Sequence, residues 1–396
     1  EIRLSLVGSE MCIRDSYMTK KYLLSTLIVL ISIFLCACQF STLSSSKKDT
    51  NKDKENIANM YAKKSTQNKK DWKVYQGDIA HVFYHPVITE PKVAFTQEKN
   101  QAKGNFDWMI TADEFKRSLN ELYKHHYILI DPHEAYDLKG KTVTRKELKL
   151  PKGKKPLILS IDDMNYYEYM RGHGYADRLV LDQKQHVVSE TKDKNGKVTT
   201  SETNDIVPIL NQFVKDHPDF SLNGQKGVVA LTGYNGVLGY RTNELNNKDY
   251  PKRKKEAEKV VKAMKRDGWT FASHSWGHID FANSSYHQIV RDTKRWKKEV
   301  EPIIGKTDLF IYPHGAQDRG SKAYQYLVHD EGFKFLAGVG PNNFTDIGND
   351  SVYQDRVAID GLNLYDFKYK LKPFLDPSKV YSEKDRQYFK GDKSYQ

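Results

Sequence analysis

Cysteine is scarce in this chain of 396 residues, and all of it lies near one end. Cys12, Cys36 and Cys38 all precede residue 39, and no other cysteine follows. The rest of the chain can therefore form neither disulfide bonds nor thiolate metal ligands. Any metal ion in the folded part must be held by His, Asp or Glu side chains.

The chain also lacks the composition of a membrane bundle, since 38% of its residues are hydrophobic and 29% are charged. Its net charge is +12, but the lysines are scattered and no nucleic-acid-binding signature accompanies them. We therefore expect no nucleic-acid partner. A basic protein of this kind suits an anionic surface such as a cell wall or a membrane.

One apolar run stands near the N-terminus, and its flanks are typical of a secretory signal. The basic stretch 18–21 precedes an apolar segment, 22–35, that is too short for a comfortable membrane span. The run ends in Leu-Cys-Ala-Cys (35–38), which resembles a bacterial lipobox. Cys38 would then be lipid-modified, and the mature protein would be extracytoplasmic and anchored to the bacterial cell membrane. An ordinary cleaved signal with incidental cysteines is the alternative.

Composition divides the chain into five segments. Residues 1–17 resemble translated sequencing-adapter read-through, so we expect them to be a translation artefact. The lipoprotein signal spans 18–38. Residues 39–72 have few large apolar side chains, which predicts a disordered tether. A single folded domain is expected at 73–375, followed by a C-terminal tail at 376–396.

Segments typical of strands and of helices alternate through the expected domain. This alternation predicts an α/β fold in which helical crossovers join parallel strands into a closed or nearly closed barrel. A stretch of alternating residues centred on Asn195-Gly196 predicts an inserted β-hairpin at 177–203. The expected strands are 79–85, 127–131, 157–161, 227–232, 269–273, 308–312, 333–339 and 356–359. The expected helices are 111–126, 205–216, 251–266, 286–304 and 321–330.

Polar residues follow four of the expected strands. His85 ends the first, Asp162-Asp163 ends another, His274 ends a third, and Pro313-His314-Gly315 (313–315) ends a fourth. The active sites of such barrels lie at the C-terminal ends of the strands. We therefore expect these side chains to converge on one rim.

The adjacent carboxylates Asp162 and Asp163 follow the apolar run 157–161. Two neighbouring charges next to an apolar core are costly unless a cation or hydrogen bonds compensate them. A divalent metal ion on one of them would do so and would keep the other ionised as a base. A pair that merely caps a helix is the alternative.

Two histidines four residues apart, His274 and His278, lie on the segment that follows another strand. This spacing lets both rings converge on one ion. Together with Asp163 they would form a set of three ligands that leaves positions open for water and substrate. A structural or exposed histidine pair is the alternative.

The sequences Ser-Ile-Asp-Asp-Met (160–164) and His-Ser-Trp-Gly-His (274–278) resemble the first two motifs of the polysaccharide deacetylases of the NodB-homology type, carbohydrate esterase family 4. The resemblance implies that Asp162 is the catalytic base and that Asp163, His274 and His278 bind the metal. Tyr-Pro-His-Gly (312–315) resembles the third motif, whose backbone N–H, here that of His314, would stabilise an oxyanion. It also implies a distorted parallel (β/α) barrel of about seven strands. Zn²⁺ is the metal expected for an Asp-His-His set, and Ni²⁺ or Co²⁺ would also fit.

Three departures from that family pattern stand out. Met164 replaces the usual Gly of the first motif, and Ile311 replaces an Arg that braces the base, for which Arg356 is a speculative substitute. No late Leu-x-His motif supplies a general acid. However, Val-Phe-Tyr-His (82–85) has a similar form and resembles the start of circularly permuted family members. We therefore predict that His85 is the general acid, with a structural histidine as the alternative.

The resemblance implies a metal-dependent hydrolase that removes acetyl groups from N-acetylated sugars of an extracellular or cell-wall polysaccharide. Two alternatives stay open: a weakly active or inactive glycan-binding surface lipoprotein that keeps the metal, and a metallohydrolase of another ester or amide. Tyrosines near the expected rim could stack on sugars, although packing is their more common role. These are Tyr166, Tyr167, Tyr234 and Tyr240.

Overall fold

The computed structural model describes residues 71–193 and 195–394. The expected translation artefact, the lipoprotein signal with Cys38, and the tether up to residue 70 lie outside these residues. The hypotheses on these segments therefore stay predictions. Within the described ranges, no helix is both long enough and apolar enough to cross a membrane.

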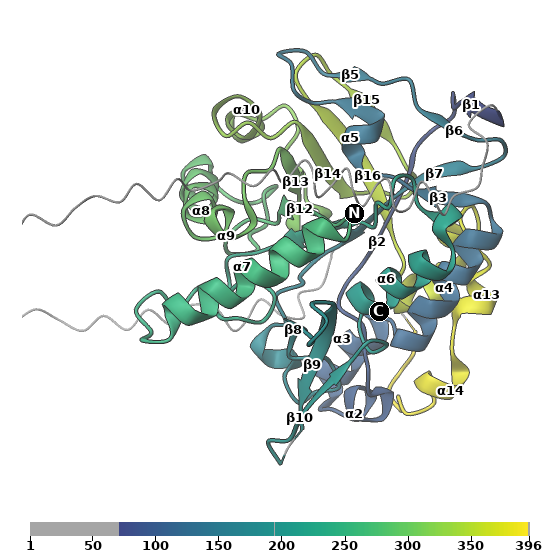
Figure 1. Cartoon of the computed structure of the whole chain (residues 1–396), viewed down its shortest axis with the longest axis vertical. Coiled ribbons are helices and arrows are strands. Elements are labelled where there is room, and N and C mark those ends of the chain that lie inside the picture. Colours follow the sequence, from purple (N-terminus) through teal and green to yellow (C-terminus); the bar gives the residue numbers. More distant parts are fainter. Residues whose placement is uncertain (1–70, 194, 395–396) are drawn as a thin grey trace, which may run out of the picture. The chain divides into compact units, whose positions relative to one another are not determined.

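Seven parallel strands form a closed barrel, which confirms the predicted fold class (Figure 1). The ring runs β7–β11–β12–β13–β14–β16–β2, and β2 pairs with β7 again, so no edge stays open. The strands are β2 (Ala80–Tyr84), β7 (Lys155–Ile161), β11 (Val228–Leu231), β12 (Thr270–Ser273), β13 (Leu309–Ile311), β14 (Phe335–Val339) and β16 (Val352–Ala358).

The barrel strands are mostly apolar on both faces, as expected of parallel strands covered by helices, and the buried polar exceptions lie in β2, β7, β12 and β16. In β7, Leu157 and Leu159 pack in the core between the strands and the helices, and Ile158 packs in the barrel interior. A further strand, β3 (Tyr127–Leu129), pairs with the beginning of β7.

The barrel is distorted between its first and last strands. Strand β16 pairs with β2 only at Val357 and Ala358. The earlier part of β16 instead pairs antiparallel with β15 (Thr345–Ile347). The first and last strands are nevertheless neighbours, as the sequence reasoning required if His85 is to reach the site.

Helices follow the strands and cover the barrel (Figure 1). Thr111 and Glu114 form the predicted capping box of α4. The helix expected at 286–304 is divided near Pro302, which has no N–H to continue the hydrogen-bond ladder. The longer helices are α3 (Lys99–Trp108), α4 (Ala112–Lys124), α6 (Ile206–Asp216), α7 (Tyr250–Arg266) and α8 (Tyr286–Glu299). The short ones are α2 (Pro91–Phe95), α5 (Pro132–Ala135), α9 (Glu301–Ile304), α10 (Lys322–Gln325), α11 (Gly361–Tyr365) and α12 (Lys368–Leu371). Short 3₁₀ or π turns are η2 (Glu168–Met170), η3 (Pro218–Phe220), η4 (Pro313–Gly315) and η5 (Tyr326–Asp330).

The insert at 177–203 is a three-stranded antiparallel sheet and not the expected hairpin. Its strands are β8 (Arg178–Leu181), β9 (Val187–Lys192) and β10 (Val198–Ser201). The turn at Asn195-Gly196 occurs as predicted. The additional turn is built by Asp182, whose Oδ1 accepts the backbone N–H groups of Lys184 and His186. Two small antiparallel pairs lie elsewhere: β1 (Trp72–Val74) with β6 (Lys149–Pro151), and β4 (Tyr136–Asp137) with β5 (Thr144–Arg145).

Residues 376–396 were predicted to be a C-terminal tail, but the described part of this segment is helical and packs on the domain. It contains α13 (Pro377–Val380) and α14 (Glu383–Arg386). Arg386 is fully buried and pairs with Glu114 of α4 at 2.7 Å. The segment is polar in composition, but a buried ion pair and hydrogen bonds to backbone carbonyls hold it against the domain.

Candidate active site

The predicted site residues all come from segments that follow barrel strands. His85 follows β2, Asp162 and Asp163 follow β7, His274 follows β12, and His314 lies in η4 after β13. His274 Nε2 lies 3.9 Å from Asp162 Oδ2 and 3.7 Å from Asp163 Oδ1, and His278 Nε2 lies 3.7 Å from Asp163 Oδ2. The structure thus brings both carboxylates and both imidazoles together.

Asp163, His274 and His278 offer ligand atoms that all lie within 4.8 Å of one another. His274 Nδ1 lies 2.8 Å from the Ile311 carbonyl, an acceptor only, so Nδ1 carries the proton and Nε2 is free to bind a metal. Burial lowers the pKa of His274 to about 4 and that of His278 to about 3, which keeps both rings neutral. One carboxylate and two neutral imidazoles fit a divalent transition-metal ion.

Positive backbone angles turn these ligands towards each other. Asp163 has φ +60°, Ser275 has φ +59° and His278 has φ +53°. Such values are uncommon outside glycine and cluster at functional sites. Asp292 holds the turn between the two histidines, because its carboxylate accepts the backbone N–H groups of Trp276 and Gly277 at 2.6 and 2.7 Å.

Asp162 has a different partner from its neighbour. Arg356 of β16 donates to its two oxygens at 2.7 and 2.9 Å, and both side chains are buried. Burial by itself raises the pKa of Asp162, but the charge of Arg356 and the hydrogen bonds that it donates outweigh burial and lower that pKa to about 2. The carboxylate is therefore ionised at neutral pH.

The departures from the motifs have structural explanations. Ile311, where the family pattern has an Arg, is a buried apolar residue of the barrel interior. Arg356 reaches the same carboxylate from another strand. Met164 is fully buried in the core between strands and helices, and the left-handed position of the turn falls on Asp163. A side chain at 164 therefore causes no conflict.

His85 lies beside this cluster without a bond to it. The ring is partly buried, with its centroid 5.7 Å from that of Phe83. It lies close enough to Asp162, His278 and Asp360 to influence the pKa values of those three groups. Within the described residues its ring nitrogens have no hydrogen-bond partner.

His314 lies on the other side of His278. Its backbone has φ +57° and its ring packs edge-on against that of His278, with centroids 4.4 Å apart. The next residue, Gly315, also has a positive φ and would clash with Val339 if it carried a Cβ. The sequence predicted a role only for the backbone N–H of His314. The structure also shows a contact between its ring and that of His278.

Tyr167 is a site residue whose contact with Asp163 the sequence did not indicate. Its hydroxyl donates to Asp163 Oδ1 at 2.5 Å and lies 3.1 Å from Thr232 Oγ1. The rings of Tyr169 and Tyr234 flank it, and each is partly exposed. Of the other predicted rim tyrosines, Tyr166 bonds to Asp205 and Tyr240 to the Leu179 carbonyl, and both are buried packing residues.

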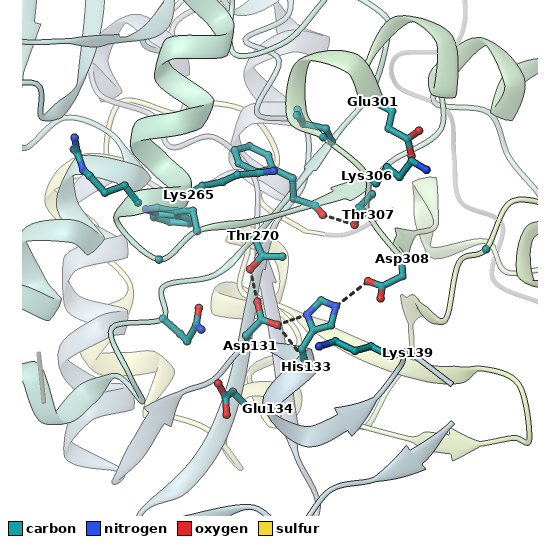
Figure 2. A pocket seen from close by; sticks show the side chains of 18 of the residues that line it. Asp131, His133, Glu134, Lys139, Lys265, Thr270, Glu301, Lys306, Thr307 and Asp308 are labelled. Atoms are coloured by element: carbon teal, nitrogen blue, oxygen red, sulfur yellow. Dashed lines mark hydrogen bonds and ion pairs between the residues drawn. The ribbon is translucent and has the colours of Figure 1, made fainter. Parts of the chain in front are cut away.

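A pocket of about 1050 Å³ lies away from this site, among residues at or before the beginnings of β11 to β14 and residues of the segment 131–139 that follows β3 (Figure 2). None of the predicted site residues lines it. Its most connected side chain is His133, which lies 2.5 Å from Asp131 and 2.8 Å from Asp308. Residues at the N-terminal end of such barrels usually serve stability, and the chemistry described above lies at the other end.

Comparison with known proteins gives one family match. A family model described as polysaccharide deacetylase matches residues 240–332. This stretch contains His274, His278 and the 312–315 turn, but neither His85 nor the Asp162-Asp163 pair. No curated protein sequence matches the chain.

Solved structures with similarity to the chain include several deacetylases, all of low identity. The Streptococcus pyogenes deacetylase PplD in complex with acetate is 14% identical, with a TM-score of 0.44, and covers 76% of this chain and 100% of its own. IcaB from Ammonifex degensii is 12% identical, with a TM-score of 0.40, and covers 78% and 100%. BC0361, a polysaccharide deacetylase from Bacillus cereus, is 15% identical, with a TM-score of 0.39, and covers 73% and 65%.

Proposed function

We propose that this protein is a metal-dependent hydrolase that removes acetyl groups from N-acetylated sugars of an extracellular or cell-wall polysaccharide. One observation carries the proposal: two adjacent carboxylates have separate partners. Asp163 faces two neutral imidazoles, and Asp162 is held ionised by Arg356. This arrangement separates a metal ligand from a general base. The polysaccharide deacetylase match at 240–332 supports the choice of substrate class.

Asp163, His274 and His278 would hold the metal, with Zn²⁺ as the first choice and Ni²⁺ or Co²⁺ as alternatives. When bound, the ion would supply Lewis-acid polarisation of the acetyl carbonyl and a lower pKa for an attacking water. Three ligands from the protein leave coordination positions open, as a catalytic site requires.

The chain's own residues supply the proton transfers. Asp162 accepts a proton from the attacking water as the oxygen bonds to the acetyl carbon. The backbone N–H of His314 donates to the oxyanion that develops on that carbon. The carbon–nitrogen bond then breaks, and His85 protonates the departing amine. The products are acetate and a free amino sugar.

The substrate and location follow from the same proposal. The partner is a polysaccharide, with no nucleic acid involved. A lipid anchor at Cys38 would hold the protein on the outer side of the bacterial cell membrane, within reach of wall glycans.

Acetate release by the purified protein tests the function. We expect release from N-acetylglucosamine oligomers after addition of Zn²⁺, Co²⁺ or Ni²⁺, and none after chelation. Asp162→Asn should abolish release and keep the metal, whereas His274→Ala should lose the metal. His186→Ala is the matched control, because His186 belongs to an exposed Asp182–His186–Glu202 cluster that could itself hold metal.

The outcomes separate the alternatives. Bound metal without acetate release from any glycan would favour a binding protein. Release from acetylated xylan but not from N-acetylated sugars would favour an esterase.

The role of His85 has its own test. His85→Ala should lower kcat by roughly 10²- to 10⁴-fold, the usual contribution of a general acid, with unchanged metal content. Loss of metal in this variant would instead make His85 a ligand.

A further inference from the structure

A buried polar network runs through the barrel interior directly beneath Asp162. It links His81 of β2, Ser160 of β7 and Gln354 of β16 to the Arg356 guanidinium. All four side chains have 0% exposure. Three neighbouring strands of the ring supply them, on the side of the barrel where β16, β2 and β7 lie next to each other.

The rest of the interior makes room for this network. On the other strands of the ring, β11, β12 and β14 hold Ala230, Ala272 and Ala337, which are small and fully buried. Arg356 can therefore lie inside the barrel, with its guanidinium 4.1 Å from the centroid of the Phe83 ring. Since an unpaired buried polar group is costly, every member of the network needs a partner.

The direction of each hydrogen bond is fixed by chemistry. The amide of Gln354 donates to the Ile79 carbonyl at 2.8 Å, so its oxygen faces His81 Nδ1 at 3.0 Å. That oxygen only accepts, and His81 Nδ1 must therefore carry the proton. Burial, and then the charge of Arg356, keep the pKa of His81 well below its ordinary value, so the ring is neutral and Nε2 is an acceptor.

The remaining bonds follow from this tautomer. Ser160 Oγ lies 3.0 Å from His81 Nε2 and must donate its only proton there. Its oxygen is then free to accept from Arg356 Nη1 at 3.1 Å. The guanidinium also donates from Nε to the Gly338 carbonyl at 3.0 Å. Its plane is thus held at two points besides the two bonds to Asp162.

We propose that His81 and Ser160 are positioning residues for the reaction, because they fix the plane of the Arg356 guanidinium that orients the base Asp162. Neither residue touches the reacting atoms. The inference rests on the proposed function, in which Asp162 accepts the proton of the attacking water.

Two variants of His81 test the contacts of its two ring nitrogens separately. Glutamine places its oxygen near the position of Nε2 and can still accept from Ser160. Asparagine keeps only the contact towards Gln354. We expect His81→Gln to retain most of kcat, and His81→Asn to lose roughly ten- to a hundredfold, by analogy with groups that orient metal ligands. KM should change little in either.

Ser160→Ala tests the same link from the other side, and it should lower kcat by a similar factor with metal content and KM unchanged. Ser189→Ala is the matched control, since Ser189 is an equally buried strand serine in the β8–β10 insert, and it should keep kcat. An active wild type whose kcat is unaffected by Ser160→Ala, or an asparagine variant as active as the glutamine variant, would overturn the positioning role. If instead the wild type releases no acetate at all, the proposed function itself fails.

The tautomer of His81 can also be measured in the wild-type protein, so this test does not depend on whether a variant folds or is active. Nitrogen-15 NMR of histidine-labelled wild-type protein should show His81 as the neutral Nδ1–H tautomer, assigned by the signal lost in His81→Gln. An Nε2–H tautomer or a protonated ring would overturn the network, because Ser160 could not then donate to His81.

Discussion

At the scale of single residues, the adjacent Asp162 and Asp163 differ because of their backbone and their partners. The left-handed angle at Asp163 turns its carboxylate towards His274 and His278, whereas Asp162 continues inward to Arg356. A metal ligand must share its electrons with the ion, and a base must keep them for a proton. Two carboxylates side by side can serve both purposes only if their surroundings differ in this way.

Replacement of Arg356 should affect both activity and stability. Arg356→Met leaves the buried Asp162 carboxylate unpaired, which costs about 3–5 kcal/mol of unfolding free energy. The pKa of Asp162 should rise from about 2, since the Arg356 charge is the main influence that lowers it. The proposed base Asp162 is active when ionised, so the acid limb of kcat/KM should move to higher pH.

In the wild type, the stabilisation that Asp162 contributes depends on pH. Because the folded pKa of Asp162 lies below the unfolded value of about 3.9, its contribution is complete above that pH and is lost as pH falls towards 2. Arg356→Lys keeps the positive charge but not the two hydrogen bonds to Asp162. Its free energy of unfolding and its acid limb should lie between those of the wild type and of Arg356→Met. An unchanged acid limb in Arg356→Met would contradict the role of this residue.

Tyr167 should affect metal binding more than protein stability. Tyr167→Phe removes the hydroxyl that donates to Asp163 and should weaken zinc affinity by roughly tenfold or more. Tyr169→Phe is the matched control, because Tyr169 stacks on Tyr167 but, among the described residues, makes no hydrogen bond to the proposed ligand Asp163. Isothermal titration with Zn²⁺ would measure both, and equal affinities would show that the hydrogen bond does not support the site.

At the scale of elements, the C-terminal helices are held by one buried ion pair. Arg386 donates to both Glu114 oxygens and to the carbonyls of Phe106 and Met109. Glu114→Gln leaves that charge uncompensated, so we expect a loss of about 3–5 kcal/mol in urea unfolding. Asp113→Asn, which breaks an exposed pair with Arg117 on the same helix, should cost less than about 1 kcal/mol. Similar losses of unfolding free energy in both variants would show that burial does not make the Glu114–Arg386 pair more important than an exposed pair.

A second element contact gives a prediction of pH dependence. His133 of α5 lies between Asp131 and Asp308, and although burial opposes it, these carboxylates raise its pKa to about 10 (Figure 2). Because this folded value exceeds the unfolded 6.5, the stabilisation is complete below pH 6.5 and is lost as pH rises towards 10. The Tm difference between wild type and His133→Gln should therefore shrink over that range. His287→Gln, on the exposed face of α8, should show no such trend.

The sequence predicted those elements whose signals are local. Apolar runs and caps located the barrel strands and α4, and the polar residues after the strands located the rim. The third strand of the insert was missed because a single Asp, Asp182, forms its turn without glycine. The packing of Arg386 and the bond between Tyr167 and Asp163 could not be predicted, because each depends on residues brought together only by the fold.

At the scale of the whole domain, the two ends of the barrel have different chemistry. The C-terminal ends of the strands carry histidines that are kept neutral, and the N-terminal end carries His133, which is kept charged. Only neutral imidazoles bind metal ions. In the proposed function, the described domain offers one end to a metal and a substrate, while ion pairs at the other end link residues next to the strands.

Metal binding should accordingly stabilise the domain as a unit. An ion that binds only the folded state at a hundred times its Kd adds about 2.7 kcal/mol, so Zn²⁺ should raise the Tm of the chelated protein by roughly 5 °C. Mg²⁺ should have no such effect, because it prefers oxygen ligands in octahedral geometry. The shift should vanish in His278→Ala and persist in His186→Ala, as measured by differential scanning calorimetry. A shift retained in His278→Ala and lost in His186→Ala would move the metal to the exposed cluster on the insert and contradict the proposed site.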